Sequence, residues 1–237
     1  MLKLESLELR QGDFRLVADW QAAAGARIAL IGPSGAGKST LLAAIAGFLA
    51  PAAGRILWQG RDLGPLPPGA RPVTMLFQDQ NLFPHMTLAQ NIGLGLRPDL
   101  RLDAAQRAQV DGALARVGLA GLGDRRPAQL SGGQIGRAAL ARALLRARPL
   151  LLLDEPFAAL GPALKDEMLA LLDEVAAEAG ATVLMITHDP EDARRFARQV
   201  VLVSGGVARP PQDTVALFDR PPPELQAYLG ARKNPAR

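Results

Sequence analysis

The chain has 237 residues, 49% of them hydrophobic and 21% charged, which is enough apolar sequence to bury one good core and excludes disorder over most of its length. It has no cysteine, so disulfides, thiolate metal sites and a cysteine nucleophile are excluded. The net charge of +4 is spread over alternating acidic and basic residues with few aromatics, a pattern that does not favour nucleic-acid binding.

The sequence predicts neither a leader nor a membrane span. The opening residues MLKLESLELR lack the apolar core of a signal peptide, so we expect the chain to stay in the cytoplasm. The longest uncharged windows, residues 39–54 and 80–96, are shorter than the roughly 18 apolar residues that a spanning helix needs.

In chain order, the first elements are strands followed by a helix. Period-two apolar patterns predict two strands near residues 2–9 and 14–20, and a buried run predicts a third at Arg27–Ile31. A helix is expected at residues 38–48. Two short strands then follow, at residues 55–59 and 73–78.

From about residue 81 to residue 148 the pattern becomes helical. Asp103 and Gln106 have the spacing of a capping box that opens a helix to about Val117, and another helix follows Ser131.

After residue 148 strands and helices alternate again. The expected elements are a strand at 150–153, a helix at 162–179, a strand at 182–187 and a helix at 189–197. Such alternation indicates an α/β fold with a parallel sheet covered on both faces. Only the tail from about residue 230 looks loose.

A glycine-rich segment directly after the strand Arg27–Ile31 fits the pattern G-x-x-x-x-G-K-[ST]. Its residues are Gly32, Pro33, Ser34, Gly35, Ala36, Gly37, Lys38, Ser39 and Thr40. The glycines let backbone N–H groups wrap a phosphate, and the N-terminus of the following helix favours an anion there. In this pattern Lys38 reaches the β- and γ-phosphates and Ser39 coordinates Mg²⁺. The segment predicts a nucleoside triphosphate site.

Two acidic residues end the buried strand expected at 150–153. Asp154 is suited to present a carboxylate to the Mg²⁺ shell, through water, and Glu155 is a candidate to polarise an attacking water. Alone, two acids that close a core strand are as often structural as catalytic. Beside a phosphate loop, the catalytic interpretation is favoured.

A five-residue segment indicates the class of NTPase. It consists of Leu130, Ser131, Gly132, Gly133 and Gln134. Ser131 and Gln134 have capping-box spacing, so the segment also begins a helix, and a helix N-terminus with two glycines and a hydroxyl is an anion site. The segment resembles the signature sequence of ATP-binding cassette (ABC) ATPases. The resemblance extends over roughly residues 2–230.

This resemblance implies a P-loop NTPase of the ABC cassette fold, with a mostly parallel sheet core, an N-terminal antiparallel β part and a helical subdomain. It implies one domain at residues 1–230, with the catalytic core at about 1–80 and 149–230, the helical subdomain at about 81–148, and a loose tail at 231–237. The implied ligands are ATP and Mg²⁺. The implied partner is a second copy of the chain in a head-to-tail dimer, in which each signature closes over the other copy's ATP.

Two further residues match the family in their order along the chain. Gln78 corresponds to the glutamine that touches Mg²⁺ and water, so it joins Ser39 and Asp154 in the implied metal site. His188 corresponds to the switch histidine that contacts the γ-phosphate. With Glu155, these two residues form the implied catalytic set.

The chain departs from the family at two positions. Gln11 stands where the family usually has an aromatic residue that stacks on adenine, and Phe14 is a candidate to replace it from three residues away. Gly161 stands where the family has an aspartate, which would also cap the following helix slightly better than glycine does.

One cassette without a fused membrane domain is typical of an importer subunit. Residues 82–96 correspond to the surface that receives the permease, and they begin with apolar Leu82, Phe83 and Pro84. The amino-acid sequence of this stretch and of the segments around it is similar to that of the ATP-binding subunits of bacterial thiamine importers.

That similarity implies ATP-driven uptake of thiamine or its phosphates at the cytoplasmic face of the inner membrane, with permease subunits as partners and a periplasmic binding protein as an indirect one. The alternatives are an importer of iron(III), polyamine or sulfate and, from another class, a soluble ABC ATPase that acts on nucleic acid.

Overall fold

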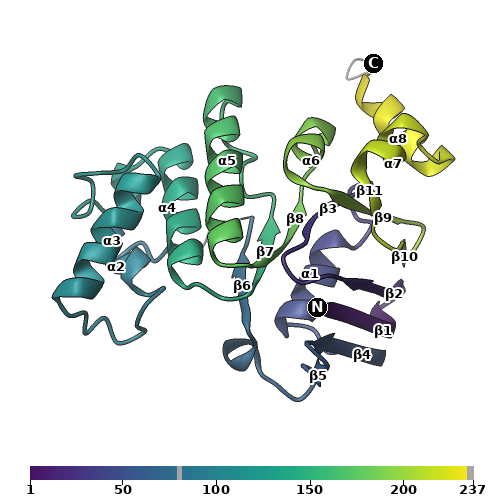
Figure 1. The fold of residues 1–237 in the computed structure, drawn as a ribbon, viewed down its shortest axis with the longest axis horizontal. Helices are drawn as coiled ribbons and strands as arrows, with labels where there is room; N and C mark the ends of the chain where they lie inside the picture. Colours follow the sequence, from purple (N-terminus) through teal and green to yellow (C-terminus); the bar gives the residue numbers. More distant parts are fainter. Residues whose placement is uncertain (79–81, 234–237) are drawn as a thin grey trace. The chain divides into compact units, whose positions relative to one another are not determined.

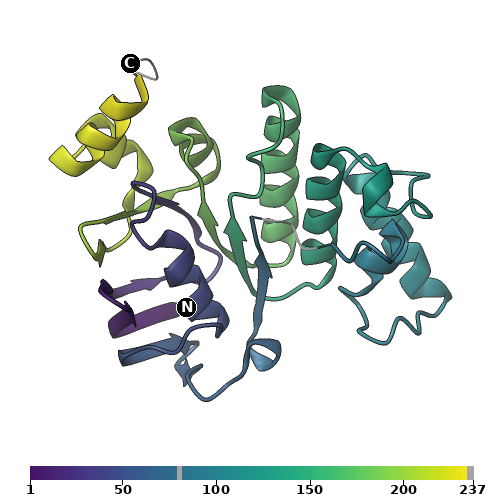
Figure 2. The same cartoon turned by 180° about the vertical axis from the view of Figure 1, so that it is seen from behind.

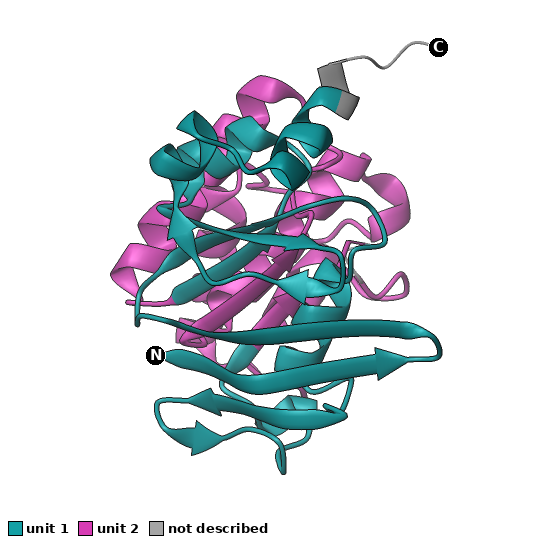
Figure 3. Ribbon diagram, turned by 90° about the vertical axis from the view of Figure 1, so that its right-hand side faces the viewer, with its two compact units in different colours: residues 1–73, 182–237 teal, residues 74–181 magenta. Residues whose placement is uncertain are grey.

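The computed structural model describes residues 1–78 and 82–233. They form two compact units, coloured separately in Figure 3. Unit 1 comprises residues 1–73 and 182–237, and unit 2 comprises residues 74–181. The subdivision into a catalytic core and a helical subdomain stays a prediction.

Unit 1 begins with antiparallel strands. The strand β1 (Leu2–Gln11) pairs with β2 (Phe14–Ala22) on one side and with β4 (Ala53–Trp58) on the other, and β4 pairs in turn with β5 (Arg61–Asp62). The apolar residues of β1 are all buried, at positions 2, 4, 7 and 9. The three-residue step from Leu4 to Leu7 is a β-bulge, with Ser6 at a φ of 43°, which keeps both leucines on the buried face.

The same unit contains parallel strands. The strand β3 (Arg27–Ile31) runs parallel to β8 (Thr182–Ile186) and to β9 (Gln199–Ser204). All residues of β3 and β8 are buried, as expected for strands covered on both faces. Two short strands, β10 (Val207–Ala208) and β11 (Gln212–Asp213), pair with β9. Within unit 1 the strand order is β5-β4-β1-β2-β10-β9-β3-β8.

The helices of unit 1 are α1 (Lys38–Ala46), the one-turn helix η1 (Pro68–Ala70), α6 (Pro190–Phe196), α7 (Thr214–Asp219) and α8 (Pro223–Lys233). Figures 1 and 2 show α6, α7 and α8 grouped at the end of the unit that lies away from β1, β2 and β4. The helix α8 extends three residues into the tail that the sequence predicts to be loose. The last four residues, 234–237, lie outside the described part.

Unit 2 is mainly helical. Its strands β6 (Val73–Leu76) and β7 (Leu150–Asp154) are neighbours, and its helices are α2 (Leu88–Gly93), α3 (Ala104–Arg116), η2 (Pro127–Gln129), α4 (Gly132–Leu145) and α5 (Pro162–Glu178). The helices α2, α3 and α4 pack on one another, and an ion pair of 2.8 Å between Arg116 and Glu174 joins α3 to α5.

Two helices of unit 2 begin as the sequence predicts. Asp103 caps α3 through the N–H of Gln106, and Ser131 caps α4 through the N–H of Gln134, each with a complete capping box. Among the described residues, no helix combines the length and the apolar character that crossing a bilayer requires.

A buried arginine holds the C-terminus of α1. Arg71 is only 3% exposed, and its guanidinium donates to the carbonyl oxygens of Ala44 and Ile45, both at 2.9 Å, and of Leu66 at 3.0 Å. Burial lowers the pKa of this guanidinium, which nevertheless stays charged. A cation at the C-terminus of a helix also interacts favourably with the helix dipole. Arg71 therefore fixes the end of the helix that starts at the phosphate loop.

Replacing Arg71 with methionine keeps much of the side-chain volume and leaves these buried carbonyl groups without a donor. We expect the free energy of unfolding to fall by about 3 kcal/mol, measured by urea denaturation. The exposed Arg61→Met is the matched control and should change it by less than about 0.5 kcal/mol. Equal unfolding midpoints for the two variants would contradict this role.

Candidate active site

The parallel register of β3 and β8 brings two predicted site segments to one edge of the sheet in unit 1. Leu30 lies opposite Ile186, so the chain leaves both strands at the same level. After β3 comes the phosphate loop, and after β8 comes His188, which is half-buried. Segments that follow the carboxyl ends of parallel strands are where α/β proteins bind ligands.

The phosphate loop passes directly over the backbone of β9. A Cβ on Gly32 would lie 2.0 Å from the carbonyl oxygen of Val203, and Gly32 has a φ of 148°, so only glycine fits there. The next residues, Pro33, Ser34 and Gly35, are exposed. The loop is thus anchored at its start and accessible at its tip, which is where an anion would be bound.

Lys38 is folded over the loop that precedes it. Its side chain is buried, and its ammonium donates to the carbonyl oxygens of Gly32 at 2.8 Å and Pro33 at 2.9 Å. The neighbouring Ser39 is exposed in the first turn of α1. The cation and the hydroxyl that the sequence pattern requires therefore stand beside the same loop.

An aromatic ring lies against this loop. A Cβ on Gly37 would be 2.4 Å from Cζ of Phe14, so the ring occupies the space beside the glycine. Gln11, which stands opposite Phe14 in the β1–β2 hairpin, is exposed. Of these two residues, Phe14 is the one that contacts the phosphate loop.

The acidic pair lies in unit 2, at the end of β7. Asp154 is the last residue of the strand and is buried, whereas Glu155 is half-buried and has a φ of 49°. A positive φ is unfavourable for a side chain of this size, and residues held in such conformations cluster at functional sites. The strand therefore ends in two carboxylates with different environments.

The signature segment occupies the exposed N-terminus of α4. Ser131 and Gly132 are exposed, Leu130, Gly133 and Gln134 are half-buried, and the Ser131 hydroxyl accepts from the N–H of Gln134 at 3.3 Å. A Cβ on Gly133 would lie 3.2 Å from Leu160, so the glycine lets the helix start pack closely on the segment that precedes α5. The capping interpretation is confirmed, and it leaves this helix end open to a ligand.

Gln78 does not end a strand. β6 stops at Leu76, and Gln78 is an exposed turn residue. The prediction of a strand to residue 78 is therefore wrong by two residues. The following residues 79–81 lie outside the described part.

A buried asparagine that the sequence analysis missed holds the loop before α2. Asn91 is 0% exposed; its amide donates to the carbonyl oxygens of Phe83, Met86 and Thr87, and its side-chain oxygen accepts from the N–H of Phe83 at 2.7 Å. An available signal was its position in an apolar helical stripe between Leu88 and Ile92.

The loop that Asn91 holds presents an apolar side chain to the surface. Phe83 is 44% exposed and contacts His85 edge-to-face, Pro84 is exposed, and Leu82 is half-buried. Because Asn91 fixes the backbone of this loop, the Phe83 side chain is held at the surface.

Gly161 is the N-cap of α5 and provides no side-chain hydrogen bond. Its φ is −68°, and a Cβ there would meet no atom within 4 Å. The backbone would therefore accept an aspartate, so the departure from the family at this position is not imposed by local geometry.

Comparisons with known proteins agree with this architecture. A model of the ABC transporter family matches residues 17–158. The chain is 73% identical over 230 residues to the thiamine import ATP-binding protein ThiQ of Cereibacter sphaeroides, covering 97% of this chain and 100% of that protein. It is 58% identical over 231 residues to ThiQ of a Ruegeria species, covering 98% and 100%.

Among solved structures, the chain resembles the ATP-binding cassette MJ0796 in a dimeric structure described as bound to ADP and Pi. The TM-score is 0.81 with 28% sequence identity, over 90% of this chain and 99% of the other. The expected fold, a cassette with an antiparallel N-terminal part and helices around a mixed sheet, is confirmed. From the family match and the near full-length identity, the chain belongs to the ABC transporter family.

Proposed function

We propose that the chain is the ATP-hydrolysing subunit of a bacterial ABC importer that takes up thiamine or its phosphates. The observation that carries the nucleotide half is the phosphate loop, anchored on β9 and covered by Lys38. The cargo half rests on similarity over nearly the full chain to proteins named for thiamine import.

ATP binding follows from the loop and the helix behind it. Backbone N–H groups of the phosphate loop, in which Pro33 has none, and the N-terminus of α1 attract the phosphates. Lys38 would exchange its two carbonyl acceptors for β- and γ-phosphate oxygens, which are stronger acceptors because they are charged. Phe14, whose ring lies beside Gly37, would stack on the adenine in place of the usual residue at position 11.

The proposed metal residues suit Mg²⁺, which prefers oxygen ligands and keeps several waters. The Ser39 hydroxyl, the Gln78 amide oxygen and, through water, the Asp154 carboxylate would hold it. When bound, Mg²⁺ neutralises charge on the β- and γ-phosphate oxygens.

Hydrolysis is assigned to Glu155 and His188. Glu155 would accept a proton from the attacking water, while His188 would donate a hydrogen bond to the γ-phosphate and orient it. The positive φ of Glu155 supports this assignment, because such strain is kept where a side chain must point in a fixed direction.

A second copy of the chain would complete each site. The exposed N-terminus of α4 offers unpaired N–H groups and the Ser131 hydroxyl to an anion, which suits the γ-phosphate held by a partner subunit. We therefore propose a head-to-tail dimer that closes on ATP.

The permease would dock on residues 82–96, at the cytoplasmic face of the inner membrane, with the periplasmic binding protein acting indirectly. Phe83 supports this choice because it is a large apolar side chain, held at the surface by the hydrogen bonds of Asn91 to its loop. Gln78 lies only a short segment away along the chain, so the proposed Mg²⁺ contact and the docking loop are adjacent in sequence.

Removing the aromatic ring in Phe14→Ala should weaken ATP binding about tenfold, because a stacking contact with a base contributes roughly 1–3 kcal/mol. Calorimetric titration with ATP measures this. Gln11→Ala is the matched control on the opposite strand and should bind ATP as the parent does. Weaker binding by Gln11→Ala together with normal binding by Phe14→Ala would contradict the assignment.

Neutralising the proposed base in Glu155→Gln should lower the hydrolysis rate by a factor of about 100 or more while ATP binding persists. The variant should then accumulate as a dimer with trapped ATP, visible by size-exclusion chromatography with Mg-ATP. Adding Lys38→Ala should abolish the dimer, because the cation against the phosphates is lost. A monomer in Mg-ATP, or hydrolysis at the parental rate, would count against Glu155.

Introducing a charge in Phe83→Asp should disrupt docking at a cost of about 2 kcal/mol or more, because the carboxylate would be desolvated in a dry contact. Thiamine-stimulated hydrolysis in reconstituted vesicles should fall, while basal hydrolysis by the isolated subunit should persist. Val215→Asp on α7, another exposed apolar residue, is the matched control and should couple normally. A response to iron(III) or a polyamine would refute the cargo, and normal coupling by Phe83→Asp would refute the docking site.

A further inference from the structure

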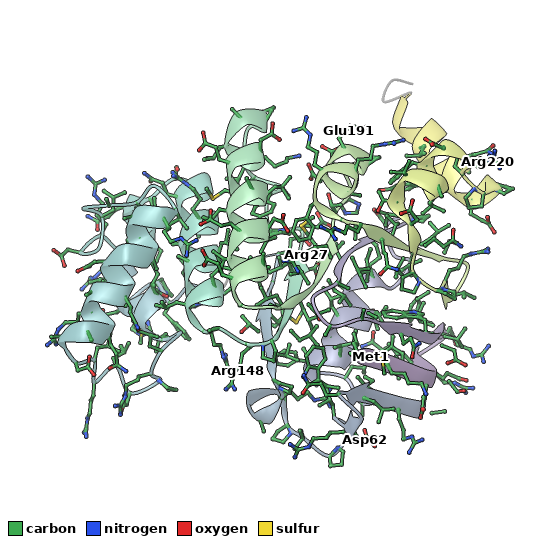
Figure 4. The ribbon with its side chains drawn as sticks, in the orientation of Figure 1. Met1, Arg27, Asp62, Arg148, Glu191 and Arg220 are labelled. Carbon is green, nitrogen blue, oxygen red and sulfur yellow. The ribbon has the colours of Figure 1, made fainter. Side chains whose placement is uncertain are left out.

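The loop that carries His188 is fixed on both sides of the histidine. The buried Thr187 hydroxyl donates to Oδ2 of the buried Asp192 at 2.9 Å and accepts from the N–H of Asp189 at 3.0 Å. The Asp189 carboxylate in turn accepts from the N–H of Glu191 and caps α6. These bonds connect the loop to α6, on which Figure 4 labels Glu191.

One further hydrogen bond reaches His188 itself, and it comes from the last helix. The hydroxyl of Tyr228, on α8, donates to the backbone carbonyl oxygen of His188 at 3.1 Å. The two residues are 40 positions apart, and Tyr228 is the only tyrosine in the sequence.

The helix that provides this hydroxyl is itself held firmly. Leu225 is fully buried, and Glu224 forms an ion pair of 2.5 Å with Arg209. Figure 4 labels Arg220, the C-cap of α7, which precedes this helix by three residues. A hydroxyl on a fixed helix restrains the atom that it binds.

We infer that Tyr228 is a positioning residue for ATP hydrolysis and acts through His188. The carbonyl that it holds belongs to the peptide unit next to the His188 Cα, so the bond restrains the backbone from which the imidazole projects. The inference rests on the proposed role of His188. It makes the rate of hydrolysis depend on α8, at the opposite end of the chain from the phosphate loop.

The test compares the hydrolysis kinetics of full-length variants. In Tyr228→Phe the ring remains and only the hydroxyl is lost, so kcat should fall about fivefold, the size of effect expected for one ordinary hydrogen bond. KM for ATP should stay unchanged, because the phosphate loop is untouched. Gln226→Ala removes a local hydrogen bond of the same helix, from the Gln226 amide to the carbonyl oxygen of Pro221 at 2.7 Å, without touching His188, and its kcat should equal that of the parent.

A double-mutant cycle separates positioning from a general effect on the fold. In the His188→Ala background, Tyr228→Phe should cause no further loss of kcat, because its effect passes through the missing imidazole. A fivefold loss in both backgrounds, a parental kcat for Tyr228→Phe beside an impaired His188→Ala, or an equal loss for Gln226→Ala would overturn the inference. Parental hydrolysis by His188→Ala would instead refute the proposed role of the histidine.

Discussion

The contact between Gly32 and the backbone of β9 constrains the whole phosphate loop. With 2.0 Å between a Cβ at position 32 and the Val203 carbonyl oxygen, any side chain would push the loop away from the sheet. Lys38 would then lose the two carbonyl groups on which it is folded, and the start of α1 would move with the loop. The position of β9 is set by its parallel register with β3, in which Ile31 lies opposite Leu202. The phosphate loop therefore depends on a strand that lies far outside its own sequence pattern.

The features that the sequence predicts well are those decided within a few residues. The capping boxes at Asp103 and Ser131 each need one partner three positions later, and both form as expected. The β1–β2 hairpin follows from period-two leucines, and its bulge at Ser6 explains the one irregular step. The sequence analysis does not predict the strand β9 or the helices α7 and α8. β9 is an apolar run, but its place in the sheet is decided by pairing with β3 and not by its own pattern.

Long-range contacts are what local patterns cannot provide. Arg71 binds the end of a helix some 26 residues earlier, and Tyr228 binds a carbonyl 40 residues earlier; neither has a distinctive neighbourhood in the sequence. The departure at Gln11 is similar. A position-by-position comparison of sequences finds no aromatic residue at position 11. The hairpin, however, places Phe14 opposite Gln11 and directs the Phe14 ring to the phosphate loop. The roles of the individual site residues stay predictions, drawn from order along the chain and supported by exposure, capping and backbone conformation.

Two loops important for the proposed mechanism, those of Phe83 and His188, are held in place by different contacts. The Phe83 loop is held by the buried Asn91, whose hydrogen bonds to this loop all lie within eight residues, so these bonds join the loop directly to α2. The His188 loop is held partly by α6 and partly by Tyr228 on a separate helix, so its geometry changes whenever α8 shifts. Local rigidity suits the proposed docking surface, whereas attachment to a remote helix suits a side chain whose orientation is proposed to affect the rate of hydrolysis. With His188 in its proposed role, the C-terminal helix would help to position a catalytic side chain.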